Sequence, residues 1–130
     1  MTRKIFAVSL LLALAAFAVA RDDAAKSVTV KGYLIDNMCA GDAGEDKDYE
    51  AEAKGHKLSC SLMPHCHKSG FAVAEGKKLY KLDEAGNKLV DDLLKATKAE
   101  KSQKGLLVEV EGTVEGTTLK ATKITEVAAQ

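Results

Sequence analysis

The stretch Leu106-Leu-Val-Glu-Val-Glu-Gly-Thr-Val-Glu115 decides the fold, because apolar and polar side chains alternate along it. Alternation with a period of two places every second side chain on the same face, as in a strand with one face buried and one in solvent. Gly112 lies in the middle of this stretch, and Gly32 lies in the middle of another strand-like stretch, Ser27–Asp36. Glycine in mid-strand permits the bends that a small closed barrel requires.

Three further strands are predicted from the remaining sequence. Residues 71–74 and 78–82 flank a Glu-Gly turn, and this arrangement predicts a β-hairpin. Residues 118–127 form the last strand of the set. The apolar positions change phase along that strand, which predicts a β-bulge near Thr122.

One helix is predicted between the hairpin and the strand that begins at residue 106. Asn87 is expected to cap it and Gly105 to end it. Acidic residues come early and lysines come late along this segment, in the order that the helix dipole favours. One face of the helix would be apolar and would comprise Leu89, Val90, Leu93, Leu94 and Thr97.

The order of these elements predicts the fold class. It reads strand, long loop, strand, strand, helix, strand, strand. Five strands with a helix between the third and the fourth is the order of an OB-fold, a small Greek-key barrel. We therefore expect a mostly β domain, a five-stranded OB-like antiparallel barrel with one α-helix between strands 3 and 4. An open antiparallel sheet with one helix packed on it is the alternative.

The amino terminus has the pattern of a secretory signal peptide over residues 1–20. Arg3 and Lys4 precede an apolar run that ends in Ala18-Val-Ala20. The run is shorter than the roughly 20 apolar residues of a membrane span, so cleavage is expected instead of anchoring. Removal of these residues from the 130-residue chain leaves 110 residues, 21–130, which suits one domain. The expected location is periplasmic or secreted, with no membrane association after cleavage.

The charge balance of the mature chain argues against two classes of partner. Without Arg3 and Lys4, 17 basic residues face 19 acidic ones, so the net charge is near −2. Nucleic acids and anionic membrane surfaces both require a basic patch. We therefore expect neither nucleic acid nor membrane as a partner.

All the cysteines and histidines of the chain lie between Cys39 and His67, inside the insertion predicted over residues 36–69. The densest part is His56-Lys-Leu-Ser-Cys60-Ser-Leu-Met-Pro-His65-Cys66-His67. Three cysteines are an odd number, so any single internal disulfide leaves one thiol over. This cluster is the part of the sequence to which we assign the chemistry of the protein.

The leading hypothesis for the cluster is a metal site. His56 and Cys60 are four residues apart, so a helix over residues 56–62 would present both on one face. Cys66 and Cys39 could close around them, and His65 and His67 could replace either ligand. Thiolate and imidazole donors suit Zn²⁺ or Cu(I). The predicted metal residues are therefore Cys39, His56, Cys60, Cys66, His65 and His67.

The chain also resembles a group of small exported bacterial proteins that share a spaced motif. The matching residues here are Gly32, Tyr33, Leu34, Asp36, Cys39, His56, Cys60, Cys66 and Gly70. The resemblance implies that Cys39, His56, Cys60 and Cys66 act as one unit, and it implies no activity. The element order is in addition similar to that of bacterial periplasmic OB-fold proteins.

Two alternatives to a metal site remain. The first is a disulfide-stabilised binding module without metal or catalysis, in which Cys39 pairs with Cys60 or Cys66. In the loop-entropy model such a bridge stabilises by about 3.5 kcal/mol, against about 2.4 kcal/mol for a bridge from Cys60 to Cys66. The second is an enzyme with Cys66 as nucleophile and His65 or His67 as base. It ranks third, and the protein is expected not to be an enzyme.

Overall fold

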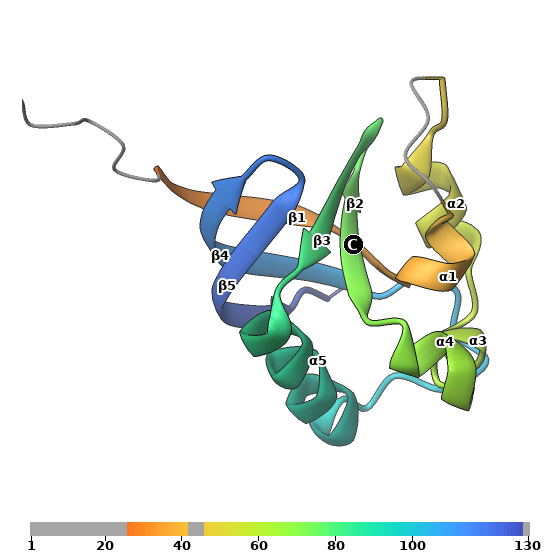
Figure 1. Cartoon of the computed structure of the whole chain (residues 1–130). Helices are drawn as coiled ribbons and strands as arrows, with labels where there is room; N and C mark the ends of the chain where they lie inside the picture. Colours follow the sequence, from red (N-terminus) through yellow and green to blue (C-terminus); the bar gives the residue numbers. More distant parts are fainter. Residues whose placement is uncertain (1–25, 42–45, 129–130) are drawn as a thin grey trace, which may run out of the picture.

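The computed structural model describes residues 26–41 and 46–128 (Figure 1). The signal peptide predicted over residues 1–20 lies outside the described residues. Among the residues that are described, no helix is long and apolar enough to cross a membrane.

Five strands close into a barrel in the order β1-β2-β3-β5-β4. They are β1 (Ser27–Asp36), β2 (Phe71–Glu75), β3 (Lys78–Leu82), β4 (Leu107–Glu115) and β5 (Thr118–Glu126). The expectation of a purely antiparallel barrel is wrong, because β3 and β5 run parallel, with Leu82 opposite Leu119. The reason is geometric. An odd number of strands cannot alternate in direction around a closed ring, so at least one neighbouring pair must be parallel.

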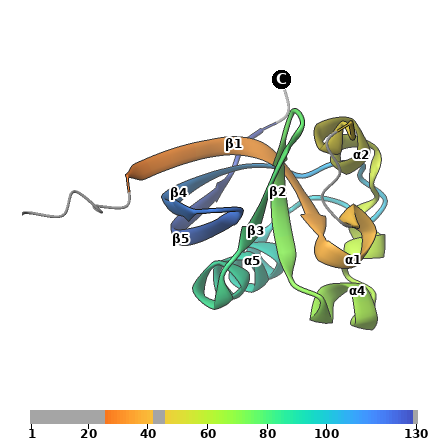
Figure 2. The ribbon, with the colours of Figure 1, turned by 45° about the horizontal axis from the view of Figure 1, so that its top comes forward.

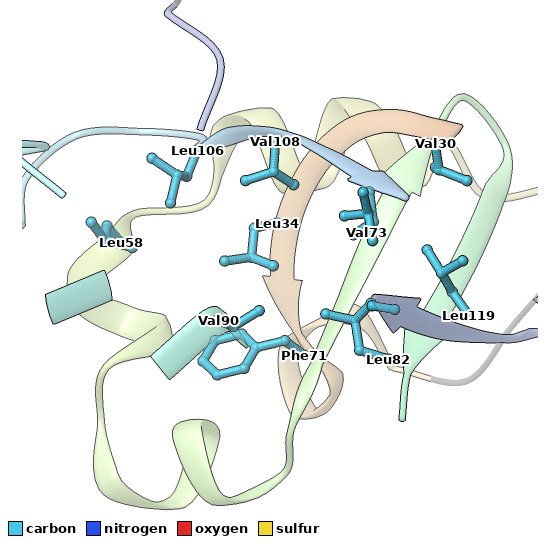
Figure 3. Close-up of a cluster of buried hydrophobic side chains, with 12 residues drawn as sticks. Val30, Leu34, Leu58, Phe71, Val73, Leu82, Val90, Leu106, Val108 and Leu119 are labelled. Carbon is cyan, nitrogen blue, oxygen red and sulfur yellow. The ribbon is translucent and has the colours of Figure 1, made fainter. Parts of the chain in front are cut away.

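The barrel interior is filled by the alternating apolar residues that the sequence pattern selected. Val108 and Val110 of β4 are 0% exposed, and side chains from the other strands meet them. Figure 3 shows this cluster, with Val90 of helix α5 (Glu84–Ala96) against Phe71 at the start of β2. The helix therefore packs against one end of the barrel core. The predicted closed β-barrel with one helix between the third and fourth strands is confirmed at this level.

The bends of the barrel depend on its mid-strand glycines and on one bulge. A Cβ atom on Gly32 would collide with the carbonyl oxygen of Ala74, and one on Gly112 with that of Lys120. The register between β4 and β5 shifts between Glu111 and Gly112, which leaves Thr122 without a partner in the ladder. The predicted bulge near Thr122 is confirmed.

Helix α5 begins and ends earlier than the sequence predicts. Its N-cap is Asp83, whose Oδ1 accepts a hydrogen bond of 2.9 Å from the Gly86 amide. Asn87 instead lies inside the helix, and its Oδ1 accepts a hydrogen bond of 2.8 Å from the Phe71 amide. The helix ends at Ala96 and not at Gly105, because its C-cap, Thr97, is already extended. Further along the chain, Lys104 forms a β-bridge with Lys57.

The described residues between β1 and β2 form four short helices that lie together to one side of the barrel (Figure 1 and Figure 2). They are α1 (Asn37–Ala40), α2 (Tyr49–Gly55), α3 (Leu58–Ser61) and α4 (Pro64–Lys68). A second apolar cluster attaches α1 and α2 to the outer face of β1, β2 and β3. Its buried members are Ile35, Ala40, Tyr49, Ala53, Ala72, Ala74 and Leu79.

The single helix predicted over residues 56–62 is wrong. His56 follows α2 as its C-cap in an extended conformation, and α3 begins only at Leu58. The backbone amide of Leu58 donates a 2.9 Å hydrogen bond to the carbonyl of Gln103, so the chain between the helices pairs with a distant segment. Cys60 and His56 therefore do not share a helix face. A new helix, α4, begins at Pro64, where the missing amide hydrogen costs no helical hydrogen bond.

Candidate metal centre

Asp36 is the residue around which the candidate site is built. It is the last residue of β1, its side chain is 0% exposed, and it is the N-cap of α1. Its Oδ1 accepts a hydrogen bond of 2.8 Å from the amide of Cys39. Its Oδ2 accepts one of 3.0 Å from the hydroxyl of Ser61 and lies 3.1 Å from Nε2 of His56. A buried carboxylate is tolerated only when hydrogen bonds or charges compensate for lost solvation, and here several do.

The hydrogen bonds keep this carboxylate ionised despite its burial. Burial by itself raises the pKa of Asp36, but the amide and thiol of Cys39, the hydroxyl of Ser61 and the charge of His56 lower it. The balance holds the pKa of Asp36 below its ordinary value. Because an ionised carboxylate only accepts hydrogen bonds, the His56 Nε2 atom must carry the proton and donate it. Asp36 is therefore an anion held in place from three sides.

Two of the predicted cysteines join Asp36. The Sγ atoms of Cys39 and Cys66 and a carboxylate oxygen of Asp36 all lie within 4.8 Å of one another. Cys39 comes from α1 and Cys66 from α4, and both are free thiols. The hydroxyl of Ser69 links the two helices, because it donates to the Cys66 carbonyl at 2.6 Å and accepts from the Met38 amide at 3.1 Å. These bonds hold the start of α1 against the end of α4.

Burial and the neighbouring carboxylate make Cys39 a weak acid. Burial, the hydrogen bond to Asp36 and the negative charge of Asp36 raise the pKa of Cys39 to about 12, and the neighbouring Cys66 contributes in the same direction. A cation bound beside Asp36 and Cys39 would favour the thiolate form of Cys39. The three groups therefore form a candidate cation site.

The other predicted site residues lie apart from this group. Cys60 is half-buried on α3 and is not part of the group of three. His65 is exposed on α4. The Nε2 atom of His67 lies 2.8 Å from a carboxylate oxygen of Asp91 on α5, and its ring meets Phe71 edge-on at 5.5 Å. Of the six predicted metal residues, the structure thus brings Cys39 and Cys66 together, with His56 one hydrogen bond away through Asp36.

Asp36 itself was not among the metal residues predicted from the sequence. It is among the residues on which the resemblance rests, but its place at the end of a strand did not mark it as a ligand. The signal that could have identified it is its place three residues before Cys39, where an N-cap carboxylate reaches the amide of the third residue on. The carboxylate of Asp36 therefore lies beside the side chain of Cys39.

The donor set favours one of the two metals named above. Zn²⁺ accepts thiolate, imidazole and carboxylate ligands, with a Zn–S bond of about 2.3 Å and a Zn–O bond of about 2.1 Å. Cu(I) selects soft sulfur ligands, and a carboxylate oxygen is a hard one. The described group contains two sulfur atoms and one carboxylate oxygen, so it fits Zn²⁺ better than Cu(I).

Comparison of the chain with known proteins finds no relative. No protein-family model, curated protein sequence or solved structure matches the chain. The resemblance to small exported bacterial proteins therefore stays a prediction from the motif.

Proposed function

We propose that this protein is an exported β-barrel protein that binds Zn²⁺ through Cys39, Cys66 and Asp36. The observation that supports the proposal is the convergence of two thiols and an ionised carboxylate within 4.8 Å. Ligands of one tetrahedral zinc ion lie about 3.4 to 3.8 Å apart, so a contraction on the order of 1 Å would complete the site. The fourth position is left to water or to a ligand brought by a partner.

In this proposal His56 and Ser61 hold the carboxylate and do not bind the metal. Both are within hydrogen-bonding distance of Asp36 Oδ2, at 3.1 and 3.0 Å. Such outer groups orient the ligands of metal sites, and their loss costs about 10- to 100-fold in metal affinity. Replacement of His56 by Ala is therefore expected to weaken zinc binding by that factor without abolishing it.

We propose binding and not catalysis as the role of the site. A thiol whose pKa is raised to about 12 is a poor nucleophile at neutral pH, which argues against Cys39. Cys66 is buried beside Asp36 and Cys39, and His67 is engaged with Asp91. These contacts do not support the enzyme hypothesis, which needs an imidazole against the Cys66 thiol.

A disulfide between Cys39 and Cys66 is the second candidate. The same proximity supports it, since a shift of the two helices toward each other would bring the sulfur atoms to the bonding distance of about 2.05 Å. Oxidation removes both thiolates, so the disulfide and the zinc ion exclude each other. In this form the protein would be a disulfide-stabilised binding module, with Cys60 as its free thiol.

Native mass spectrometry separates the two candidates. The protein is reduced, incubated anaerobically with one equivalent of Zn²⁺, and measured before and after denaturation. We expect one zinc adduct that denaturation removes. We expect Cys39→Ser and Cys66→Ser to lose it, and Cys60→Ser to keep it as a control of identical chemistry. Loss of the adduct in Cys60→Ser as well, or no adduct in any form, would overturn the assignment.

The same instrument tests the disulfide. Protein isolated without reductant is alkylated before unfolding and then digested. A mass lower by two hydrogen atoms, with alkylation at Cys60 alone, supports the Cys39–Cys66 bridge. Such a result would make the oxidised protein the form present outside the cell and would contradict zinc binding by that form.

We also propose that the barrel is an OB-fold and that residues 1–20 direct export to the periplasm or the medium. The strand order and the position of α5 between β3 and β4 support the first statement. The leader pattern supports the second statement. The slightly acidic mature chain supports the proposal that neither nucleic acid nor a membrane is a partner. Cell fractionation with amino-terminal sequencing is expected to find a mature chain that begins at Arg21. An uncut chain in the cytoplasm would refute export.

A further inference from the structure

A second site candidate is a pocket of about 500 Å³ on the outer surface of the barrel. Its walls are formed by β1, the start of β4, the end of β5, the end of α2 and the loop before β4. The residues that matter for its chemistry are Lys31, Tyr33, Lys54, Lys104, Leu107 and Val127. None of them belongs to the candidate metal centre.

The pocket has an excess of positive charge. Lys31, Lys54 and Lys104 line it, and none of the three is within ion-pairing distance of a carboxylate of the described residues. Glu126 also lines the pocket, and its carboxylate, which accepts a 2.6 Å hydrogen bond from the hydroxyl of Thr97, offsets one of the three positive charges. Three ammonium groups around one hollow repel each other, and an anion that binds among them relieves that repulsion.

The same pocket offers a ring and apolar surface. Tyr33 is half-buried, and the ammonium group of Lys54 lies 5.9 Å from the centroid of its ring. Leu107 and Val127 add aliphatic surface. A ligand with both an anionic group and a flat body would therefore find a complement for each part, as ligand pockets usually provide.

The backbone around the pocket is fixed before any ligand binds. Gly105 adopts a φ of +69°, and a Cβ atom there would lie 2.9 Å from the Lys54 carbonyl and 3.0 Å from the Tyr33 ring. The Gly105 amide donates a 2.9 Å hydrogen bond to the carbonyl of His56. Its own carbonyl accepts one of 3.1 Å from the side chain of Gln103. Glycine thus lets the loop pack against Tyr33 and the backbone of Lys54, and Lys104 of the same loop lines the pocket.

We propose that this pocket binds a small organic anion, a phosphate or carboxylate group carried on a ring-bearing body. The lysines would hold the anionic group, and Tyr33 with Leu107 would contact the ring. The site is independent of the zinc proposal, because no metal ligand takes part.

The test is a ¹H–¹⁵N NMR titration of the full chain in zinc-free buffer with inorganic phosphate, phenyl phosphate and benzoate. We expect saturable shifts centred on Tyr33, Lys54 and Gly105. The Lys54→Gln/Lys104→Gln double variant is expected to weaken binding at least tenfold. Tyr33→Leu is expected to weaken phenyl phosphate and benzoate but to leave inorganic phosphate unchanged. Tighter binding of phenyl phosphate than of benzoate identifies phosphate as the preferred group, and the reverse order identifies carboxylate.

Lys77→Gln is the matched control, because Lys77 is an exposed lysine of the turn between β2 and β3. It removes the same charge and is expected to leave all three affinities unchanged. If the double variant does not fold, Lys31→Gln on exposed barrel surface replaces it, with an expected weakening of several-fold. Shifts spread evenly over the exposed lysines, or equal losses in Lys77→Gln and the pocket variants, would overturn the proposal.

Discussion

Asp36 shows how much can depend on one side chain. It ends β1, caps α1, accepts hydrogen bonds from Ser61 and His56, and lies beside both thiols of the candidate site. Removal of one partner from a buried hydrogen-bonded group costs about 1 to 3 kcal/mol. Replacement of Asp36 therefore affects stability and metal binding together.

The first prediction concerns the pH dependence of the metal-free protein. The folded-state pKa of Asp36 is lowered, so the stability that it contributes is present above about pH 4 and is lost as pH falls through that lower value. Asp36→Asn is expected to be less stable than the native protein at pH 6, with a gap that narrows as the solution is acidified. Urea unfolding between pH 6 and pH 2.5 measures this. A gap that stays constant would contradict the ionised state of Asp36.

The second prediction concerns the reactivity of Cys39. Burial and the neighbouring carboxylate raise its pKa to about 12, so iodoacetamide is expected to modify it slowly at pH 8 in the reduced, metal-free protein. In Asp36→Asn the negative charge is gone, and the modification of Cys39 is expected to be at least several-fold faster. Peptide mapping over time gives both rates. The rate at Cys60 serves as the internal control and should be equal in the two proteins.

The residues of the site could be predicted only in part. Cys39 and Cys66 follow from composition, because so few side chains of this chain are thiols. Asp36 does not, because one aspartate among many acidic residues has no distinctive pattern until the fold brings it against two cysteines. The engagement of His67 with Asp91 likewise depends on how α4 meets α5.

At the scale of elements, the strands are positioned by glycines that no other residue can replace. Gly112→Ala would press a methyl group into the carbonyl of Lys120 on the neighbouring strand. The third prediction is a loss of about 1 to 3 kcal/mol in the free energy of unfolding, the usual cost of overpacking. Gly55→Ala is the control, because nothing lies within 4 Å of its added methyl group and alanine favours helix. Chemical denaturation compares the two, and equal stabilities would disprove the steric argument.

Strands were predicted better than helices for a physical reason. The alternation along β4 and the change of phase along β5 are local signals. The structure shows both, as alternating burial in β4 and as the register shift between β4 and β5. The positions of the ends of α5 and of the break between α2 and α3 are not determined by the neighbouring sequence. Residues 57 and 104 form a β-bridge across a long sequence separation, and both lie in stretches that the sequence predicted to be helical.

At the scale of the whole molecule, the parallel pair between β3 and β5 follows from closure of five strands and could not be read from any single segment. Closure also fixes where the insertion leaves and rejoins the barrel. It leaves after Asp36 and rejoins at Phe71, and these two residues are opposite each other in the β1–β2 ladder. The candidate metal centre lies at this junction.

The fourth prediction is a zinc-dependent stability. A ligand that binds only the folded protein stabilises it by about 4 kcal/mol at a thousandfold excess over its dissociation constant. Zinc in that excess is expected to raise the Tm of the reduced protein, and a chelator should reverse the effect. Calorimetry measures the shift. Cys60→Ser should respond like the native chain and Cys39→Ser should not respond, whereas a response in both would place the metal elsewhere.

The position of the two thiols has a consequence for the speed of folding. The first pair of the β1–β2 ladder, Asp36 with Phe71, can form only after the 34 residues between them have closed a loop. Compared with a four-residue hairpin loop, this closure costs about 2 kcal/mol more in chain entropy. A disulfide between Cys39 and Cys66 persists in the unfolded chain and leaves only a few free residues on each side of the bridge. The first contact between β1 and β2 would then require closure of only these short segments. The oxidised protein is therefore expected to form the barrel faster than the reduced protein.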